Sequence, residues 1–188
     1  MTDTATLVDR CRRGDDLAWE ALVYRHQSRV YSVALHYLRD REEARDVAQD
    51  VFVRIYRNFH SFDDRGDHFV PWMLSIARNA CLDRLRRQQV RPMVPPIPVE
   101  DAPGTPDPRP SAEQALLAEA RRKLLHRAIA QLSDVSREMI LLKEIQGLNL
   151  QQISEMLAVP LGTVKSRSVR ARIELARTVI ALDPSYGA

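Results

Sequence analysis

The chain has 188 residues, of which 45% are hydrophobic and 6% aromatic, and its formal net charge is +3. This is enough for a buried core in one domain or two small ones, and the modest charge excludes a globally basic protein. Two cysteines without a CxxC pair, and histidines without an HExxH-like spacing, give no reason to expect a disulfide framework, a metal site or a cofactor. No apolar run approaches the roughly 18 residues that cross a bilayer, and no signal peptide is recognisable, so we expect a cytoplasmic protein without direct membrane insertion.

The first predicted helix begins after Gly14, where Asp15 or Asp16 can cap it, and ends at Arg39 and Asp40. A second runs from about Arg41 to Phe59 with apolar residues at i, i+3, i+4 and i+7, which predicts one buried face. The opposite face carries a polar strip with one apolar member: Asp46, Gln49, Asp50, Val53 and Arg54. By spacing alone this strip could be a solvated surface or a binding surface.

A loop from His60 to His68 follows, with turn-forming residues at its centre and phenylalanines on either side. Pro71 marks the start of the next helix, which becomes strongly basic: five arginines and one aspartate lie between Arg78 and Arg91. Its predicted core positions are Trp72, Ile76, Ala80 and Leu85. An aromatic loop that leads into a basic helix suits single-stranded nucleic acid, because bases stack on rings and phosphates pair with arginine.

Residues 91–111 contain eight of the chain's eleven prolines and show no periodicity. This composition predicts a stiff linker that could extend roughly 65 Å in polyproline geometry. We therefore expect two folded domains on a tether.

The second domain is predicted to begin near Ala112. A first helix carries an apolar pattern made of Leu116, Leu117, Ala120, Leu124, Ile129 and Leu132. Ser133 and Asp134 start the next helix, and Gly147 closes it. The inward residues of that helix are predicted to be Met139, Ile140, Leu142 and Ile145. The six residues after Leu182 are expected to fray.

Residues 149–177 have the pattern of a helix-turn-helix. Leu150, Ile153 and Leu157 share one face of a short helix, and Pro160 stands where a second helix can start. Val164, Ala171 and Leu175 are predicted to point inward. The second helix carries five cations against one acid, which indicates a polyanionic partner, and in such motifs its N-terminal half enters the major groove. The residues predicted to face DNA are Thr163, Lys165, Ser166, Arg167 and Arg170.

Four motifs in this order resemble the extracytoplasmic-function (group IV) sigma factors of bacterial RNA polymerase. They are DVAQDVFVRIYRNF from Asp46, FVPWMLSIARNACLDRLRR from Phe69, SREMILLKEIQGLNLQQISEML from Ser136 and GTVKSR from Gly162. The resemblance implies an all-α fold of two small helical domains. Residues 1–90 would form a region 2-like domain, 91–111 a linker, 112–182 a region 4-like domain and 183–188 a tail.

The same resemblance implies a division of tasks. The strip on the second helix would bind the β′ clamp helices of core polymerase, and the β flap would be a further contact. The first domain would recognise and melt the start-proximal promoter element. Its implied DNA contacts are Phe62, Arg65, Gly66, Asp67, His68, Arg78, Asn79, Arg84 and Arg87. The second domain would read the upstream element as duplex, and an anti-sigma factor would be a further partner.

Three positions depart from the family pattern. Ala158 stands at the turn glycine of the helix-turn-helix, which is permissible if it avoids positive φ. Ser168 falls where an inward leucine is common, and the loop before Phe69 is about one residue longer than usual.

Two other functions compete with this interpretation. The first is a helix-turn-helix repressor or activator that binds a palindrome as a homodimer without polymerase. The second is an enzyme acting on nucleic acid, but the sequence shows no paired carboxylates in a glycine-rich cleft, no phosphate loop and no nucleophilic triad. We therefore expect no catalytic residues and no small-molecule substrate, and the family resemblance implies a protein that directs polymerase to promoters in a stress or envelope response.

Overall fold

The computed structural model describes residues 3–59, 62, 68–88 and 112–187, with side chains at all of these except 88 and 112–115. Every regular element in these residues is a helix, which confirms the predicted all-α class. The chain divides into two compact units, Met1–Ile97 and Pro98–Ala188, called here the N-terminal and C-terminal units. The predicted linker lies outside the described residues, and the predicted domain boundaries stay predictions. Among the described helices, none is long and apolar enough to cross a membrane.

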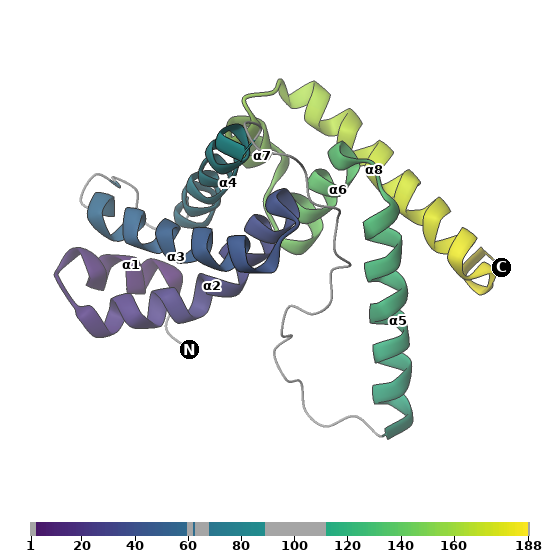
Figure 1. The fold of residues 1–188 in the computed structure, drawn as a ribbon, viewed down its shortest axis with the longest axis horizontal. Helices are drawn as coiled ribbons and strands as arrows, with labels where there is room; N and C mark the ends of the chain where they lie inside the picture. Colours follow the sequence, from purple (N-terminus) through teal and green to yellow (C-terminus); the bar gives the residue numbers. More distant parts are fainter. Residues whose placement is uncertain (1–2, 60–61, 63–67, 89–111, 188) are drawn as a thin grey trace. The chain divides into compact units, whose positions relative to one another are not determined.

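The N-terminal unit consists of α1 (Thr4–Arg12), α2 (Asp16–Leu38), α3 (Arg41–Asn58) and α4 (Phe69–Gln88). Helix α2 packs against α1, α3 and α4 (Figure 1). Asp15 caps α2 by accepting from the Ala18 amide, and Asp40 caps α3 by accepting from the Glu43 amide. Both caps satisfy amides that have no partner within their own helix.

Helix α1 was missed by the sequence analysis, which placed the first helix after Gly14. Asp3 caps it, and Leu7 and Val8 are buried. The signal is a cap followed by a short apolar pair in a nine-residue helix, too short for a clear periodicity. Its stability must come from packing on α2.

Aromatic rings close the core of the N-terminal unit near the start of α4. Phe69 is 0% exposed, and its ring centroid lies 5.7 Å from that of Phe62 and 6.0 Å from that of Trp72. Further along α4 the buried residues are Met73, Leu74, Ala77, Ala80 and Cys81. Of the four predicted core positions of this helix, Ala80 is buried, whereas Trp72, Ile76 and Leu85 are only half-buried, because α4 turns a neighbouring face to α2 and α3.

His26 is buried in the same unit. Its Nε2 lies 3.4 Å from the Thr4 hydroxyl, and its ring lies 5.7 Å from that of Phe69. Burial, with Arg29 and Arg25 nearby, lowers the His26 pKa to about 4. The side chain is therefore neutral at physiological pH.

The C-terminal unit consists of α5 (Ala112–Gln131), α6 (Asp134–Ile140), α7 (Leu150–Leu157) and α8 (Leu161–Leu182), with a π-helical turn at Leu141–Ile145. Its fully buried side chains include Met139, Leu142, Ile153, Val164 and Ala171. The prediction that Ile145 points inward is wrong, since it is 53% exposed. The π-helical turn adds a residue to the turn and rotates Ile145 outward.

The predicted core pattern of α5 is only partly correct. Leu116 is 73% exposed and Leu117 is also exposed, whereas Ala128 and Leu132 are buried. Only the C-terminal part of α5 therefore contributes to the core. The tail also differs from expectation, because Pro184–Gly187 forms a 3-10 helix that packs against α8.

Two charged side chains tie α6 to its neighbours. Arg137 donates to the carbonyl oxygens of Ile129 (3.1 Å), Ala130 (2.8 Å) and Leu132 (2.7 Å), which satisfies the C-terminal end of α5. Glu174 of α8 accepts from the Ser133 amide (2.7 Å) and from the hydroxyls of Ser133 (3.0 Å) and Ser136. These hydrogen bonds lower the Glu174 pKa.

Candidate functional site

The turn between α7 and α8 is defined by local hydrogen bonds. Asn149 and Gln152 form a reciprocal capping box at the start of α7. At the other end of α7, the Ser154 hydroxyl donates to the Val159 carbonyl at 2.6 Å and the Val159 amide donates to the Ser154 carbonyl at 3.1 Å. Helix α8 then starts at Leu161, as the position of Pro160 predicted. The predicted helix-turn-helix is therefore confirmed.

Ala158 adopts the left-handed conformation in this turn, with φ 53° and ψ 44°. The expectation that it avoids positive φ is therefore wrong. The chain must reverse between α7 and α8 at this point, and an L-residue with a Cβ pays a steric cost there of about 1–2 kcal/mol. The turn keeps a glycine-like geometry without a glycine.

The predicted DNA-facing residues lie on the side of α8 away from the core. Lys165, Ser166 and Arg170 are exposed, while Thr163 and Arg167 are half-buried. The Ser166 hydroxyl donates to the Thr163 carbonyl at 2.9 Å. On the inner side, Val164, Ser168 and Ala171 are buried, so Ser168 takes the inward position that the family pattern assigns to leucine.

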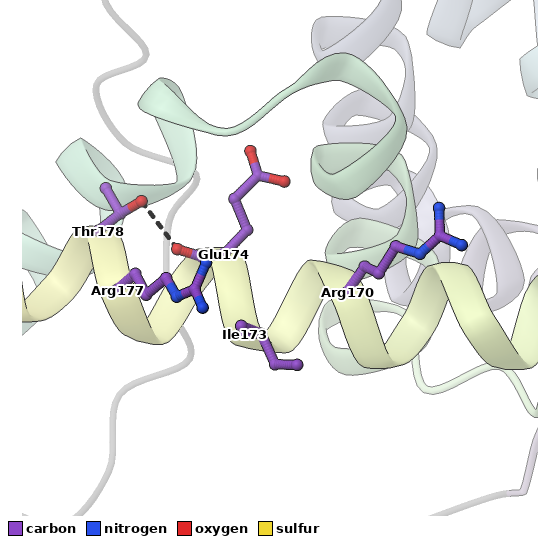
Figure 2. Close-up of a pocket in the computed structure, with 5 residues that line it drawn as sticks. All are labelled: Arg170, Ile173, Glu174, Arg177 and Thr178. Atoms are coloured by element: carbon purple, nitrogen blue, oxygen red, sulfur yellow. Dashed lines mark hydrogen bonds between the residues drawn. The ribbon is translucent and has the colours of Figure 1, made fainter.

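The one acid in the sequence of α8, Glu174, is hydrogen-bonded to the start of α6. Glu174 lines a pocket with Arg170, Ile173, Arg177 and Thr178 (Figure 2), but its carboxylate is engaged by Ser133 and Ser136 of the α6 start. Arg172 pairs with Glu144 at 2.8 Å, whereas Lys165, Arg167 and Arg170 have no ion pair within the described residues. The N-terminal half of α8 therefore presents positive charge together with hydroxyl groups, the chemistry that contacts phosphates and guanine edges.

The strip predicted on α3 is a single exposed face. Asp46, Gln49, Asp50 and Arg54 are exposed, and Val53 is 48% exposed, whereas Val51 and Ile55 on the opposite side are fully buried. Within the part of the chain that the structure describes, neither the Asp46 nor the Asp50 carboxylate has an ion pair or a hydrogen bond. An exposed valine one turn after two uncompensated carboxylates suits a partner with basic and apolar groups.

The residues predicted to contact the start-proximal element are only partly brought together. Asn79, Arg87 and His68 are exposed. Arg78 is half-buried and donates to the Tyr37 hydroxyl at 3.1 Å, and Arg84 lies 3.8 Å from the Glu43 carboxylate. Arg65, Gly66 and Asp67 lie outside the described residues.

Phe62 is described, and it is buried rather than open to solvent. Its ring lies 4.6 Å from that of Trp72, and its carbonyl accepts a hydrogen bond from Arg12 of α1. No local pattern in the sequence singles out Arg12, because the contact joins residues that are 50 positions apart. Phe62 can shape a neighbouring surface by packing, but its ring does not present a face for stacking.

Comparisons with known proteins agree with this architecture. The Sigma-70 region 2 family matches residues 22–91, and the Sigma-70, region 4 family matches residues 122–175. The RNA polymerase sigma-H factor of Pseudomonas aeruginosa is 34% identical over 172 residues, which cover 88% of each chain. The ECF RNA polymerase sigma-E factor of Escherichia coli K12 is 34% identical over 178 residues, which cover 92% of this chain and 91% of the relative.

Two solved structures have a similar fold. CnrH, in complex with the cytosolic domain of CnrY, superposes with a TM-score of 0.63 at 24% identity, covering 95% of this chain and 97% of that one. The sigma factor RpoE of Bartonella quintana, in complex with the anti-sigma factor NepR, gives a TM-score of 0.62 at 21% identity, covering 87% and 97%. At these identities the likeness concerns the fold alone.

Proposed function

The chain belongs to the extracytoplasmic-function sigma factors, which direct core RNA polymerase to promoters, and we propose that its two units supply separate surfaces for this task. The N-terminal unit binds core polymerase and the start-proximal element, and the C-terminal unit binds the upstream element. The observation that carries this proposal is a pair of exposed surfaces with different chemistry. One is the strip on α3 with its two unpaired carboxylates, and the other is the basic face of α8.

On the N-terminal unit, the α3 strip of Asp46, Gln49, Asp50, Val53 and Arg54 docks on the β′ clamp helices. What supports this is its exposure together with its uncompensated carboxylates. His68 before α4, and Asn79 and Arg87 on α4, are exposed, and they contact the melted strand together with Arg78 and Arg84 of the same helix. Arg65, Gly66 and Asp67 keep their predicted role at the base pocket.

On the C-terminal unit, Thr163, Lys165, Ser166, Arg167 and Arg170 read the upstream element in the major groove. Exposed cations on a helix-turn-helix support this assignment. One such motif spans only part of a helical turn of DNA, so a monomer needs a second reader to reach specificity. The N-terminal unit on its predicted linker provides that reader, and the β flap is a further contact of this unit.

The same two surfaces are where the activity of the chain is regulated. An anti-sigma factor holds the chain inactive in the cytoplasm until a stress or envelope signal releases it. The support is that the solved structures of similar fold include sigma factors in complex with an anti-sigma factor. An anti-sigma factor that covers α3 or α8 blocks polymerase or promoter binding directly.

The deciding experiment is run-off transcription with purified core polymerase and a library of upstream sequences. New start sites are expected only when this chain is added, with two sequence elements enriched upstream of them. A homodimeric repressor, the alternative class, would instead bind a palindrome tightly without polymerase. Tight palindrome binding without any new start sites would refute the proposed division of tasks.

A further inference from the structure

Arg12, in the last turn of α1, holds both the main chain and the ring of one distant residue. Its Nη2 donates to the Phe62 carbonyl oxygen, and its Cζ lies 5.6 Å from the centroid of the Phe62 ring. That distance is within the range in which a guanidinium is attracted to an aromatic face. The planar guanidinium can make both contacts at once, which a lysine ammonium does less well.

Phe62 also makes a main-chain hydrogen bond and several contacts with aromatic rings. It is 6% exposed, its amide donates to the Phe59 carbonyl at 3.2 Å, and its ring contacts those of Trp72, Phe69 and Phe59. Its carbonyl is in no helical ladder, so a partner from outside is needed to offset its burial. Arg12 supplies that partner and thereby joins α1 to the end of α3 and the first turns of α4.

Helix α1 is not part of the matched family region, which starts at residue 22. Through Arg12, helix α1 nevertheless contacts the junction of α3 and α4, next to the residues proposed to recognise the promoter. The contact joins a cation to a residue that lies between α3 and α4. The Phe62 ring in turn packs against Trp72 and Phe69 in the first turn of α4, the helix that carries Asn79 and that follows His68.

We propose that Arg12 is a positioning residue for recognition of the start-proximal promoter element, acting through Phe62. This inference rests on the proposed function of the N-terminal unit. Arg12 fixes Phe62 against Trp72, and this contact sets the geometry of the residues that select bases. It does not touch the DNA itself.

Arg13 provides a matched control. It is the neighbouring residue with the same charge, but its side chain is 74% exposed and it pairs with Asp9 on its own helix. Arg12→Gln and Arg13→Gln therefore remove the same charge from the same end of α1. Arg12→Lys keeps the positive charge of Arg12 but loses the planar guanidinium group and its N–H donors.

The experiment applies run-off selection from a promoter library to core polymerase with the full-length wild-type chain, Arg12→Gln, Arg12→Lys and Arg13→Gln. For each protein, base preference is scored separately at the start-proximal and upstream elements. We expect Arg12→Gln to lower the preference at the start-proximal element by about three- to tenfold, the scale of the net contribution of one ordinary hydrogen bond. Arg12→Lys should fall between wild type and Arg12→Gln, and Arg13→Gln should match wild type. Preference at the upstream element should not change.

Other outcomes overturn the inference. If Arg12→Gln retains the start-proximal preference of Arg13→Gln, Arg12 serves only stability, and a lower unfolding midpoint would confirm that role. A loss of yield that is equal on all sequences and is restored by Arg12→Lys would make Arg12 a phosphate contact. Equal losses of preference at both elements would indicate a general folding defect. If the wild-type chain yields no start sites, the proposed function itself fails, a result distinct from each of these.

Discussion

Aromatic rings fill part of the core of the N-terminal unit, whereas the C-terminal unit has Tyr186 as its single Phe, Tyr or Trp residue. Hydrogen bonds of charged side chains connect the helices of the C-terminal unit. In the first, Phe59, Phe62, Phe69 and Trp72 pack around the junction of α3 and α4. In the second, Arg137 and Glu174 connect α6 to α5 and α8. A small domain without large rings buries less apolar surface, so well-placed hydrogen bonds carry more of its stability.

The exposed surfaces of the two units differ in their charged side chains. The exposed strip on α3 carries two carboxylates, one arginine and one valine, and the exposed face of α8 is basic. Each unit has its own buried core and its own exposed surface. Substitutions that damage one unit's core or surface should therefore leave the other unit's properties intact.

The largest effect is expected from Phe69→Ala, which removes a fully buried ring from the aromatic core. We expect the free energy of unfolding of the N-terminal unit to fall by about 3–5 kcal/mol. Both tryptophans, Trp19 and Trp72, belong to this unit, so denaturant unfolding followed by tryptophan fluorescence reports on it alone. Met139→Ala, in the core of the C-terminal unit, is the control and should leave that transition in place. An unchanged fluorescence transition in Phe69→Ala would contradict the prediction.

Asp50→Arg tests the strip on α3. Placing a cation opposite a basic partner costs several kcal/mol in binding, so we expect binding to core polymerase to be lost while the helical circular dichroism signal stays unchanged. The matched control is Glu20→Arg, which makes the same charge change at an exposed position of α2. Equal affinities of Asp50→Arg and wild type for core polymerase would refute the assignment of the strip.

Arg167→Ala tests the basic face of α8. Recognition of the upstream element should weaken by about 1–3 kcal/mol if Arg167 contacts a base edge, and the loss should concentrate at one base position. Arg172→Ala, which removes the partner of Glu144, is the comparison. A loss that is uniform over all sequences would make Arg167 a phosphate contact instead.

The two units should also respond differently to acid. The His26 pKa is lowered to about 4, so the unfolded N-terminal unit binds a proton that the folded unit does not, and its stability falls as the pH drops from about 6.5 to about 4. The Glu174 pKa is also lowered, so its contribution is present above the ordinary pKa of a glutamate, about 4.3, and is lost at lower pH. The N-terminal unit should therefore begin to lose stability at the higher pH.

Glu174→Gln separates the acid responses of the two units. We expect it to destabilise the C-terminal unit by about 1 kcal/mol at neutral pH, the scale for a partly exposed charged hydrogen bond, and to remove the acid-dependent part of its loss. Amide hydrogen exchange of α6 and α8 across pH measures this, and tryptophan fluorescence should show no change in the N-terminal unit. An unchanged pH profile for α6 would show that the contacts of Glu174 with Ser133 and Ser136 do not control it.

The smallest effect is expected from Ala158→Gly. Relief of the positive φ should outweigh the greater flexibility of glycine in the unfolded chain, giving a gain of about 0.5–1 kcal/mol in the C-terminal unit. The melting temperature of the C-terminal unit is the measurement, and Ala176→Gly within α8 is the control that should destabilise it. A loss of stability in Ala158→Gly would mean that the turn tolerates the Cβ without strain.

Local signals in the sequence were sufficient for most helices. Helix starts are marked by the capping residues Asp15, Asp40 and Asn149, because each side chain accepts a hydrogen bond from an amide in the first turn. The proline before α8 marks a start because it has no amide hydrogen that needs a partner. The strip on α3 follows from periodicity alone, since a buried face on a straight helix fixes the opposite one. Its proposed function as a binding surface rests on the family resemblance and not on its spacing.

What the tertiary structure decided depends on contacts between distant residues. Leu116 and Ile145 fit an apolar pattern and are nevertheless exposed, the first beyond the packed part of α5 and the second after a π-helical turn. Glu174 meets Ser133 across 41 positions, and Arg12 meets Phe62 across 50. Residue type and spacing determine which helices form and which face is apolar, because those effects act within a few turns. Which polar side chains pair, and which apolar ones stay uncovered, depends on how the helices pack.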